Sequence, residues 1–398
     1  MSALAAPRWR VTLADNTVDE QEIAAVTEVL RSRWLSAGAQ TAAFEREFAD
    51  RLGADDAVAV SSGTAALHLA MLALDLGPGD EVIMPALTFV ASAAVVALAG
   101  ATPVLADVRA PDDLTVDPVD VARLVTPRTR AVVAMHYAGY PADLAALRTV
   151  SDGHGAVLVE DAAHAPVVEH DGRMLGTHGD IGCFSFFATK NVTTGEGGMV
   201  LARDQAVRER IRLARSHHLT TSTWDRLSSG DASYDVAGIG LNYRPTEVSA
   251  ALGRVQLGRL GRDRQRRREL VATYREVLAA APELVLPFAG RTGDSALHLM
   301  PVVLPDGTDR GAVREGLAAA GVQTSVHYPP VHHLSAYRGS AGASRSALTV
   351  TDAVAPRLLS LPLHSRMSDD DAVLAARALL RCLRPDRTTP SSTGRSTS

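Results

Sequence analysis

Apolar residues along the chain gather in short continuous runs, and the stretches between the runs have helical periodicity. The runs are "AVAV" ending at Val60, "EVIMP" at Pro85, "PVLADV" at Val108, "AVVAMHY" at Tyr137, "VLVED" at Asp161 and "GGMVLA" at Ala202. Continuous runs, unlike alternating ones, are typical of strands that are buried on both faces. The pattern therefore predicts an α/β fold with a mostly parallel sheet that helices cover on both sides.

The first helix is expected within residues 16–32, "NTVDEQEIAAVTEVLRS". Thr17 lies three residues ahead of Glu20, which is the spacing of a capping box. Apolar positions at Ile23, Val26 and Leu30 then indicate an amphipathic helix.

The second half of the chain has a different pattern. An arginine-rich helix is expected near residues 254–280, and the strand-like pieces "LHLMPVVLP" and "GVQTSVHYPP" flank a further helix, which favours a smaller α+β domain. The predicted organisation is an extended N-terminal arm (1–15), a large domain (16–253), a small C-terminal domain with its linking helix (254–383) and a tail (384–398). The tail is rich in Pro, Ser and Thr, and we expect it to be disordered.

Charge, cysteines and hydropathy exclude several classes of protein. The net charge is -5, from 40 Lys+Arg and 45 Asp+Glu, which argues against a nucleic-acid partner. The arginine-rich residues 259–268 are interpreted as a solvated helix face. Cys183 and Cys382 form neither a CxxC pair nor a disulfide framework, so we expect a reducing cytoplasm and no metal site. The longest apolar stretch, Ala91–Ala101, is too short to span a bilayer, so no membrane partner is expected.

Polar residues that directly follow the predicted strands are the candidates for chemistry, because open parallel sheets bind ligands at the carboxyl ends of their strands. After Val60, the turn "SSGT" opens a helix, and such a turn suits a phosphate group or is simply a helix cap. Asp161 ends the strand "VLVED", with His164 three residues later. A buried carboxylate there needs a cationic partner, for which a protonated heterocyclic nitrogen is suitable; the alternative is a helix cap with a packed histidine.

Lys190 lies between an aromatic, strand-like run and a glycine-rich turn in "FSFFATKNVTTGEGG". Partial burial lowers the pKa of a lysine and makes its amine a nucleophile toward an aldehyde. Phe89 in "PALTFVAS" follows another strand and either covers a planar ring or belongs to the core. A phosphate seat, an acid, an aromatic ring and an amine together indicate pyridoxal 5'-phosphate (PLP) as the cofactor.

Five segments carry a family resemblance: "SSGTAALHLAMLAL", "GDEVIMPALTFVAS", "VEDAAHA", "GDIGCFSFFATKNVTTGEGGMV" and "GLNYRPTEVSAALG". Together they resemble the DegT-type sugar aminotransferases of the aspartate aminotransferase superfamily, in order from about Trp34 to about His333. The resemblance implies a PLP-dependent transferase of fold type I that forms a homodimer with shared active sites.

The resemblance also implies a role for individual residues. Lys190 would hold the cofactor as a Schiff base, Asp161 would pair with the pyridine nitrogen, His164 would contact the ring hydroxyl, and Phe89 would stack on the ring. Gly63, Thr64, Ala65 and Ser185 would bind the phosphate, together with Asn242 from the partner subunit. Many relatives have glutamine at the position of His164.

The implied reaction is transfer of an amino group, with L-glutamate as the expected donor, to a nucleotide-linked keto sugar by a ping-pong mechanism. His327 and Tyr328 in "TSVHYPPVHH" and Trp34 in "RSRWLSAG" are the candidate substrate contacts. The "HYPPVH" pattern favours a 4-keto-6-deoxyhexose over a 3-keto sugar or a keto-cyclitol of the scyllo-inosose type. Lysine at position 190 argues against the related dehydratases, which have histidine there. A PLP-binding regulator without catalysis is the alternative from another class, but no helix-turn-helix pattern supports it.

Overall fold

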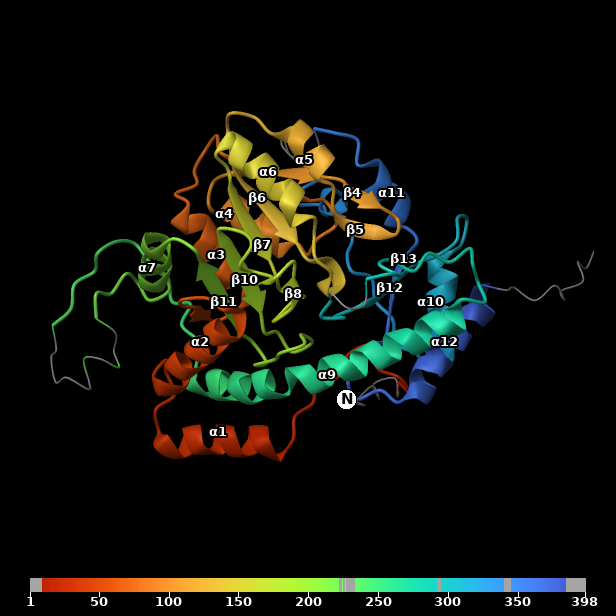
Figure 1. Ribbon diagram of the computed structural model, residues 1–398, viewed down its shortest axis with the longest axis horizontal. Helices are drawn as coiled ribbons and strands as arrows, with labels where there is room; N and C mark the ends of the chain where they lie inside the picture. The colour runs from red at the N-terminus through yellow and green to blue at the C-terminus, as the bar shows by residue number, and fades with distance from the viewer. Residues whose placement is uncertain are drawn as a thin grey trace, which may run out of the picture.

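A seven-stranded sheet forms the centre of the computed structural model, which describes residues 9–221, 224, 226, 233–291, 295–339 and 345–383 (Figure 1). Its strand order is β1-β11-β10-β7-β6-β2-β3. The strands are β1 Val58–Val60, β2 Glu81–Pro85, β3 Thr102–Ala106, β6 Thr129–Met135, β7 Val157–Asp161, β10 Ile181–Ser185 and β11 Gly198–Ala202. Only β11 pairs antiparallel with its neighbours in this sheet. The six predicted strands and the mostly parallel sheet are confirmed.

Successive residues of each strand pack against helices on opposite faces of the sheet. On β2, Val82 and Met84 join one core cluster, and Ile83 joins another. The first face carries α3 Gly63–Ala73, α4 Ala91–Leu98 and α7 Gln205–Ala214. The second carries α5 Pro118–Leu124 and α6 Leu144–His154, and, toward β1 and β11, α2 Ala39–Leu52 and α9 Glu247–Leu278. The α/β fold with helices on both faces is therefore confirmed.

Helix α1 (Glu20–Ser32) begins two residues later than the capping pattern predicted. Its N-cap is Asp19, whose side chain forms a capping box with Glu22. The Thr17 hydroxyl instead forms a hydrogen bond with the Ser365 hydroxyl at 3.0 Å. Thr17 with Glu20 and Asp19 with Glu22 both have the spacing of a capping box. In the structure the Asp19 carboxylate is the group that accepts from the free N–H groups of the helix.

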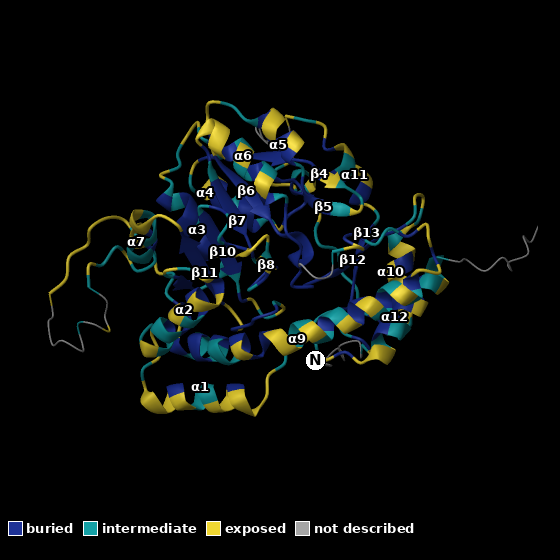
Figure 2. Ribbon diagram, viewed as in Figure 1, coloured by how far each residue is buried: buried dark blue, intermediate teal, exposed yellow. Residues whose placement is uncertain are grey.

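The predicted apolar stripe of α1 is also wrong. Ile23 and Leu30 are 52% and 56% exposed, and Figure 2 shows the outer side of α1 as largely exposed. The buried residues are Glu22 and Val29, because α1 packs on α9, where Glu22 lies 2.8 Å from Arg259. A polar contact thus decides which side of the helix faces inward.

The long helix α9 runs beneath the large sheet and continues to the second, smaller sheet (Figure 1). Its arginine-rich segment is not a uniformly solvated face as predicted, because Arg259 and Arg267 are buried. Arg259 pairs with Asp19 and Glu22. Arg267 donates to the carbonyls of Leu297 at 3.2 Å and Leu363 at 2.8 Å.

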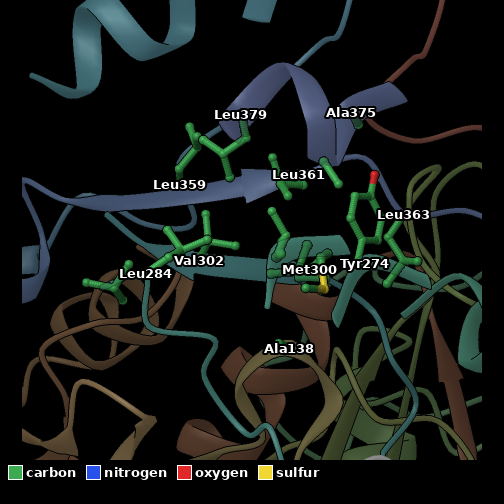
Figure 3. Close-up of a cluster of buried hydrophobic side chains, with 14 of the residues drawn as sticks. Ala138, Tyr274, Leu284, Met300, Val302, Leu359, Leu361, Leu363, Ala375 and Leu379 are labelled. Atoms are coloured by element: carbon green, nitrogen blue, oxygen red, sulfur yellow. The ribbon is translucent and has the colours of Figure 1, made fainter. Parts of the chain in front are cut away.

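The smaller sheet has two antiparallel strands, β12 Met300–Val303 and β13 Leu358–Leu361, with α10 Arg310–Ala319, α11 Thr349–Val354 and α12 Asp369–Leu383 near it. Figure 3 shows its core, where Tyr274 of α9, Val302 of β12 and Leu379 of α12 meet. The segment "GVQTSVHYPP" is not the strand that its apolar pattern predicted. It makes single bridges only, Val11 with Val322 and Ser325 with Ser360. Its two prolines have no N–H group to continue a ladder.

Two short hairpins and two 3-10 turns are also present in the described part of the chain. They are β4 Val108–Ala110 with β5 Asp113–Val116, β8 Glu169–His170 with β9 Arg173–Met174, and the turns Tyr137–Gly139 and Val331–His333. Part of the predicted arm, residues 1–8, and the whole predicted tail, 384–398, lie outside the described residues. Among the helices that the structure describes, none combines the length and apolar character needed to cross a membrane. The domain boundaries stay a prediction.

Candidate active site

A cavity of about 470 Å³ lies at the carboxyl ends of β1, β7 and β10. Its lining includes most of the predicted site residues, namely Gly63, Thr64, Phe89, Asp161, His164, Ser185, Lys190, His327 and Tyr328. These residues come from distant parts of the sequence. The cavity lies where the rule that ligands bind beyond the carboxyl ends of parallel strands predicts a site.

The N-terminus of α3 forms one wall of the cavity. The Ser62 hydroxyl caps the helix by accepting from the Ala65 N–H at 3.0 Å, so that N–H is already used and Ala65 is not part of the lining. Gly63 and Thr64 are the first residues of the helix, where N–H groups have no intrahelical partner. A Cβ atom on residue 63 would come within 2.7 Å of the Ser185 Cβ, so glycine is needed for this close approach.

Asp161 ends β7 inside the cavity and is only 4% exposed. Its carboxylate accepts from the Ala163 N–H at 3.1 Å and from the Ser92 hydroxyl at 3.3 Å. Burial raises its pKa, and the Ala163 hydrogen bond and the charge of Lys190 oppose this effect. The carboxylate is thus placed where a cationic group would stabilise its ionised form.

Lys190 is the only lysine among the 398 residues. Its half-buried side chain lines the cavity. Burial lowers its pKa to about 8, against the opposing effect of Asp161. Within the described part of the chain, no hydrogen bond or ion pair involves its amine, which leaves the amine free to react.

His164 is 1% exposed. Its Nε2 is 2.9 Å from the Tyr328 hydroxyl, and its Nδ1 is buried without a partner in the described structure. Burial holds the pKa of His164 well below 6.5, with smaller contributions from Lys190 and His327. A buried nitrogen without a partner indicates that a further polar group belongs in this cavity.

Phe89, His327 and Tyr328 also line the cavity. Phe89 is 51% exposed, so the alternative that it belongs to the core is wrong. Its ring centroid lies 5.6 Å from that of Tyr328. His327 is held by the Ser360 hydroxyl at 2.8 Å from its Nδ1, and its carbonyl accepts from the Tyr137 hydroxyl. These bonds hold His327 in the cavity lining.

Three predicted residues do not line the cavity of the single chain, namely Ala65, whose N–H bonds Ser62, and Trp34 and Asn242. Trp34 packs edge-on against Trp224, with ring centroids 4.9 Å apart. Asn242 is exposed and bridges to Ser216. Their roles in substrate and phosphate binding stay predictions.

Sequence reasoning missed three residues that contribute to the site. Ser92 bonds Asp161 from the first turn of α4, and Glu196 and His298 line the cavity. His298 precedes a strand and was interpreted as part of an apolar run. Only the packing of the smaller sheet against the larger brings it to Lys190, so no local signal could have found it.

The residues present fit PLP. The cavity offers free N–H groups at a helix start for a phosphate, a buried carboxylate for the ring nitrogen and an unpartnered histidine nitrogen for a ring substituent. It also offers the amine of Lys190 for the aldehyde. The fold and the cavity together define a PLP-dependent transferase of fold type I.

Comparison with known proteins identifies the family. Residues 16–379 match the DegT/DnrJ/EryC1/StrS aminotransferase family, and the chain belongs to it. It is 41% identical over 360 residues to the spore coat polysaccharide biosynthesis protein SpsC of Bacillus subtilis, with 89% of this chain and 92% of SpsC covered. The resemblance found in the sequence is thus confirmed, and the protein is a PLP-dependent aminotransferase.

Two solved structures are also similar. DesI, determined in the presence of its TDP-sugar product, is 34% identical with a TM-score of 0.84, covering 96% of this chain and 95% of its own. The PLP form of Spr1654 from Streptococcus pneumoniae is 28% identical with a TM-score of 0.84, covering 94% of this chain and 100% of its own. The prediction of PLP as the cofactor is confirmed.

Proposed function

We propose that the protein transfers an amino group from L-glutamate to a nucleotide-linked keto-deoxysugar, preferably a 4-keto-6-deoxyhexose. The observation that carries the proposal is the cavity itself, about 470 Å³ in volume, whose lining contains His327, Tyr328 and the single lysine. That volume exceeds what the cofactor ring alone requires and leaves room for a sugar. The TDP-sugar product of the similar DesI supports this substrate class.

Residues of this chain would hold the cofactor as follows. Gly63, Thr64 and Ser185 would bind its phosphate, and Asp161 would keep its ring nitrogen protonated. His164 lines the same cavity, and its buried, unpartnered Nδ1 would bond the ring hydroxyl. When bound, PLP supplies an aldehyde and a cationic ring that stabilises negative charge on a substrate carbon.

The remaining chemistry belongs to the chain's own side chains. With a pKa of about 8, Lys190 is partly neutral near pH 7.5, and its Nζ can take the proton that the donor's α-carbon loses. In the second half-reaction the same nitrogen returns a proton to the sugar carbon. Asp161 and His164 are themselves buried, so these two side chains are kept from water.

The sugar would bind beside Phe89 and the segment that carries His327 and Tyr328. The Tyr328 hydroxyl forms a hydrogen bond with the His164 Nε2 at 2.9 Å. A sugar hydroxyl that bonded Tyr328 would therefore be linked through His164 to the cofactor side of the cavity. His327 would contact the sugar or its phosphate, and Trp34 would line the entrance in an assembled site.

We also propose a cytoplasmic homodimer in which the partner's copy of residue 242 completes the phosphate site. The exposure of Asn242 and its position outside the cavity of its own chain support a role in a neighbouring subunit. A monomer would lack this contact, and cofactor binding would then depend on assembly.

A half-reaction screen tests the substrate class. The enzyme is loaded with pyridoxamine 5'-phosphate and mixed separately with a TDP-4-keto-6-deoxyhexose, a TDP-3-keto-6-deoxyhexose and scyllo-inosose, and the return of the visible PLP absorbance is followed. We expect the 4-keto sugar nucleotide to react fastest. Reaction with scyllo-inosose alone would overturn the proposed substrate, and an unloaded enzyme is the control for background absorbance.

A further inference from the structure

A cluster of two histidines and one aspartate lies outside the PLP cavity. His332 and His333 belong to the 3-10 turn Val331–His333, and Asp352 belongs to α11. The Asp352 Oδ1 is 2.8 Å from the His332 Nε2 and 3.0 Å from the His333 Nε2. None of the three residues lines the cavity that contains Lys190. The chemistry of amino transfer therefore does not account for this cluster.

Hydrogen bonds hold the backbone on both sides of the cluster. The N–H of Val331 donates to the Ala86 carbonyl at 2.9 Å, and the Val331 side chain is buried. On α11, the N–H and the hydroxyl of Thr351 donate to the buried Asp107 carboxylate at 2.8 and 2.6 Å. Two anchored segments thus present the three side chains, so little further ordering is needed to use them together.

The two imidazole rings converge on one carboxylate oxygen, with their centroids 4.2 Å apart. The His332 Nδ1 is buried without a partner in the described structure, so it is unpaired whether or not it carries the proton. No described residue bonds the His333 Nδ1 either. Since no second bond fixes either tautomer, each Nε2 can donate to Asp352 or present its lone pair to a cation.

Two imidazole nitrogens and one carboxylate oxygen are a ligand set for Zn²⁺, which in open sites binds three protein ligands and a water. With bonds of about 2.1 Å, tetrahedral ligand atoms lie about 3.4 Å apart. The three candidate ligand atoms are all within 4.8 Å of one another. Opening the two hydrogen bonds by about 0.5 Å would admit the ion. Mg²⁺ prefers oxygen ligands and suits this set poorly.

The charge around the cluster is mixed. The Asp352 carboxylate attracts a cation, whereas the Arg338 guanidinium, which donates to the His333 carbonyl at 3.0 Å, opposes one. The side chains of His333 and Asp352 are 49% and 52% exposed, so water and salt screen the repulsion. The surroundings thus permit a cation.

We propose that His332, His333 and Asp352 bind a divalent transition-metal ion of the zinc class, with water completing its coordination. The metal replaces the two hydrogen bonds to the carboxylate and ties the 3-10 turn to α11. That turn follows the segment with His327 and Tyr328, so the metal fixes one end of a segment that lines the cavity. The site contains no cysteine, which is why the cysteine pattern predicted no metal. The proposal is independent of the aminotransferase activity and its substrate.

Isothermal titration calorimetry of the holoenzyme with ZnCl₂, after dialysis against EDTA, measures the Kd of the site. We expect the wild-type protein to bind Zn²⁺, and MgCl₂ at the same concentration to give no binding here. His333→Gln and Asp352→Asn should each raise the Kd at least about tenfold. Both side chains are about half exposed, so both variants are expected to fold, which circular dichroism checks.

A second pair of adjacent histidines, His217 and His218, provides the matched control. No third ligand accompanies this pair within the described part of the chain, so His217→Gln should leave the Zn²⁺ titration unchanged. The proposal is overturned by no Zn²⁺ binding, or by a Kd that His333→Gln and Asp352→Asn leave unchanged, which means an adventitious ion only.

Wild-type crystals soaked in ZnCl₂ decide the matter if the variants fail to fold. Anomalous diffraction at the zinc absorption edge should give a peak between the side chains of His332, His333 and Asp352. A map without a peak at this position contradicts the proposal, whatever the outcome of the substrate screen.

Discussion

The half-buried Lys190 and the buried Asp161 have opposite charges, and both pKa values move toward the neutral form. Burial lowers the pKa of the lysine to about 8 and raises the pKa of the aspartate. Neither group has a strong partner in the described chain, which is unusual for buried ionisable side chains. This arrangement is expected of a site whose partners arrive with a ligand.

The lowered pKa predicts how the reactivity of the lysine depends on pH. Because the amine form is the nucleophile, acylation of Lys190 in the apoenzyme should rise with pH to a plateau, with its midpoint near pH 8. Labelling with acetic anhydride and peptide mass spectrometry measures the rate at this one lysine. A midpoint near 10.5, the ordinary value, would contradict the assigned environment.

Asp161→Asn is expected to lower kcat by at least about a hundredfold, because an amide cannot keep the cofactor ring protonated. In the apoenzyme the same change should raise Tm. A carboxyl whose pKa is raised by folding destabilises the folded state at every pH where it is ionised, and the effect fades as pH falls toward about 4. Calorimetry at pH 8 and pH 5 measures the difference. A variant less stable than wild type at pH 8 would contradict the burial effect.

At the scale of single residues, the sequence predicted those candidate site residues that follow strands. Asp161 and Lys190 were selected because a charged side chain that follows an apolar run requires a structural or functional explanation. His298 and Ser92 were not found, because their contacts depend on how separate elements pack. The predicted phosphate role of Ala65 is not supported by its N–H, because that group bonds Ser62, which only coordinates show.

Among the elements, α9 links the two sheets, and Arg267 is its buried attachment point. Arg267→Met removes the donor for the Leu297 and Leu363 carbonyls, and leaving buried acceptors without partners costs about 1–3 kcal/mol. Arg262→Met, on an exposed turn of the same helix, should change stability by less than about 0.5 kcal/mol. Thermal unfolding gives the Tm of each variant. Equal Tm values would argue against the role of Arg267 as the attachment point of α9.

Strand prediction succeeded where burial on both faces gives continuous apolar runs, as in β2 and β7. It failed for "GVQTSVHYPP", because an apolar pattern does not show whether a neighbouring strand is available. The prediction of an apolar stripe on α1 was wrong for a related reason. Glu22 forms an ion pair with Arg259 of α9, and the side with Ile23 and Leu30 faces outward. The apolar periodicity of α1 alone could not predict a contact with α9.

For the whole molecule, the proposed dimer predicts complementation between two inactive proteins. Lys190→Ala removes the amine of its own cavity, and Asn242→Ala weakens the cavity of the partner. In a mixed dimer both changes fall in one cavity, and the other cavity is intact. Refolding the two variants together should restore activity to about a quarter of wild type, measured with glutamate and the best keto sugar.

Each variant refolded alone is the control for complementation. Activity of the mixture no higher than the average of the two single variants would show that each cavity is complete within one chain. The outer side of α1, with exposed Ile23 and Leu30, is available for such an assembly.

The central claim is that the amine of residue 190 binds the cofactor aldehyde covalently. The most direct measurement is borohydride reduction of the holoenzyme followed by digestion and peptide mass spectrometry. We predict one phosphopyridoxyl adduct, on the peptide that contains Lys190, and loss of the visible absorbance on reduction. A holoenzyme that keeps its absorbance after reduction, or has no adduct on that peptide, would contradict the account.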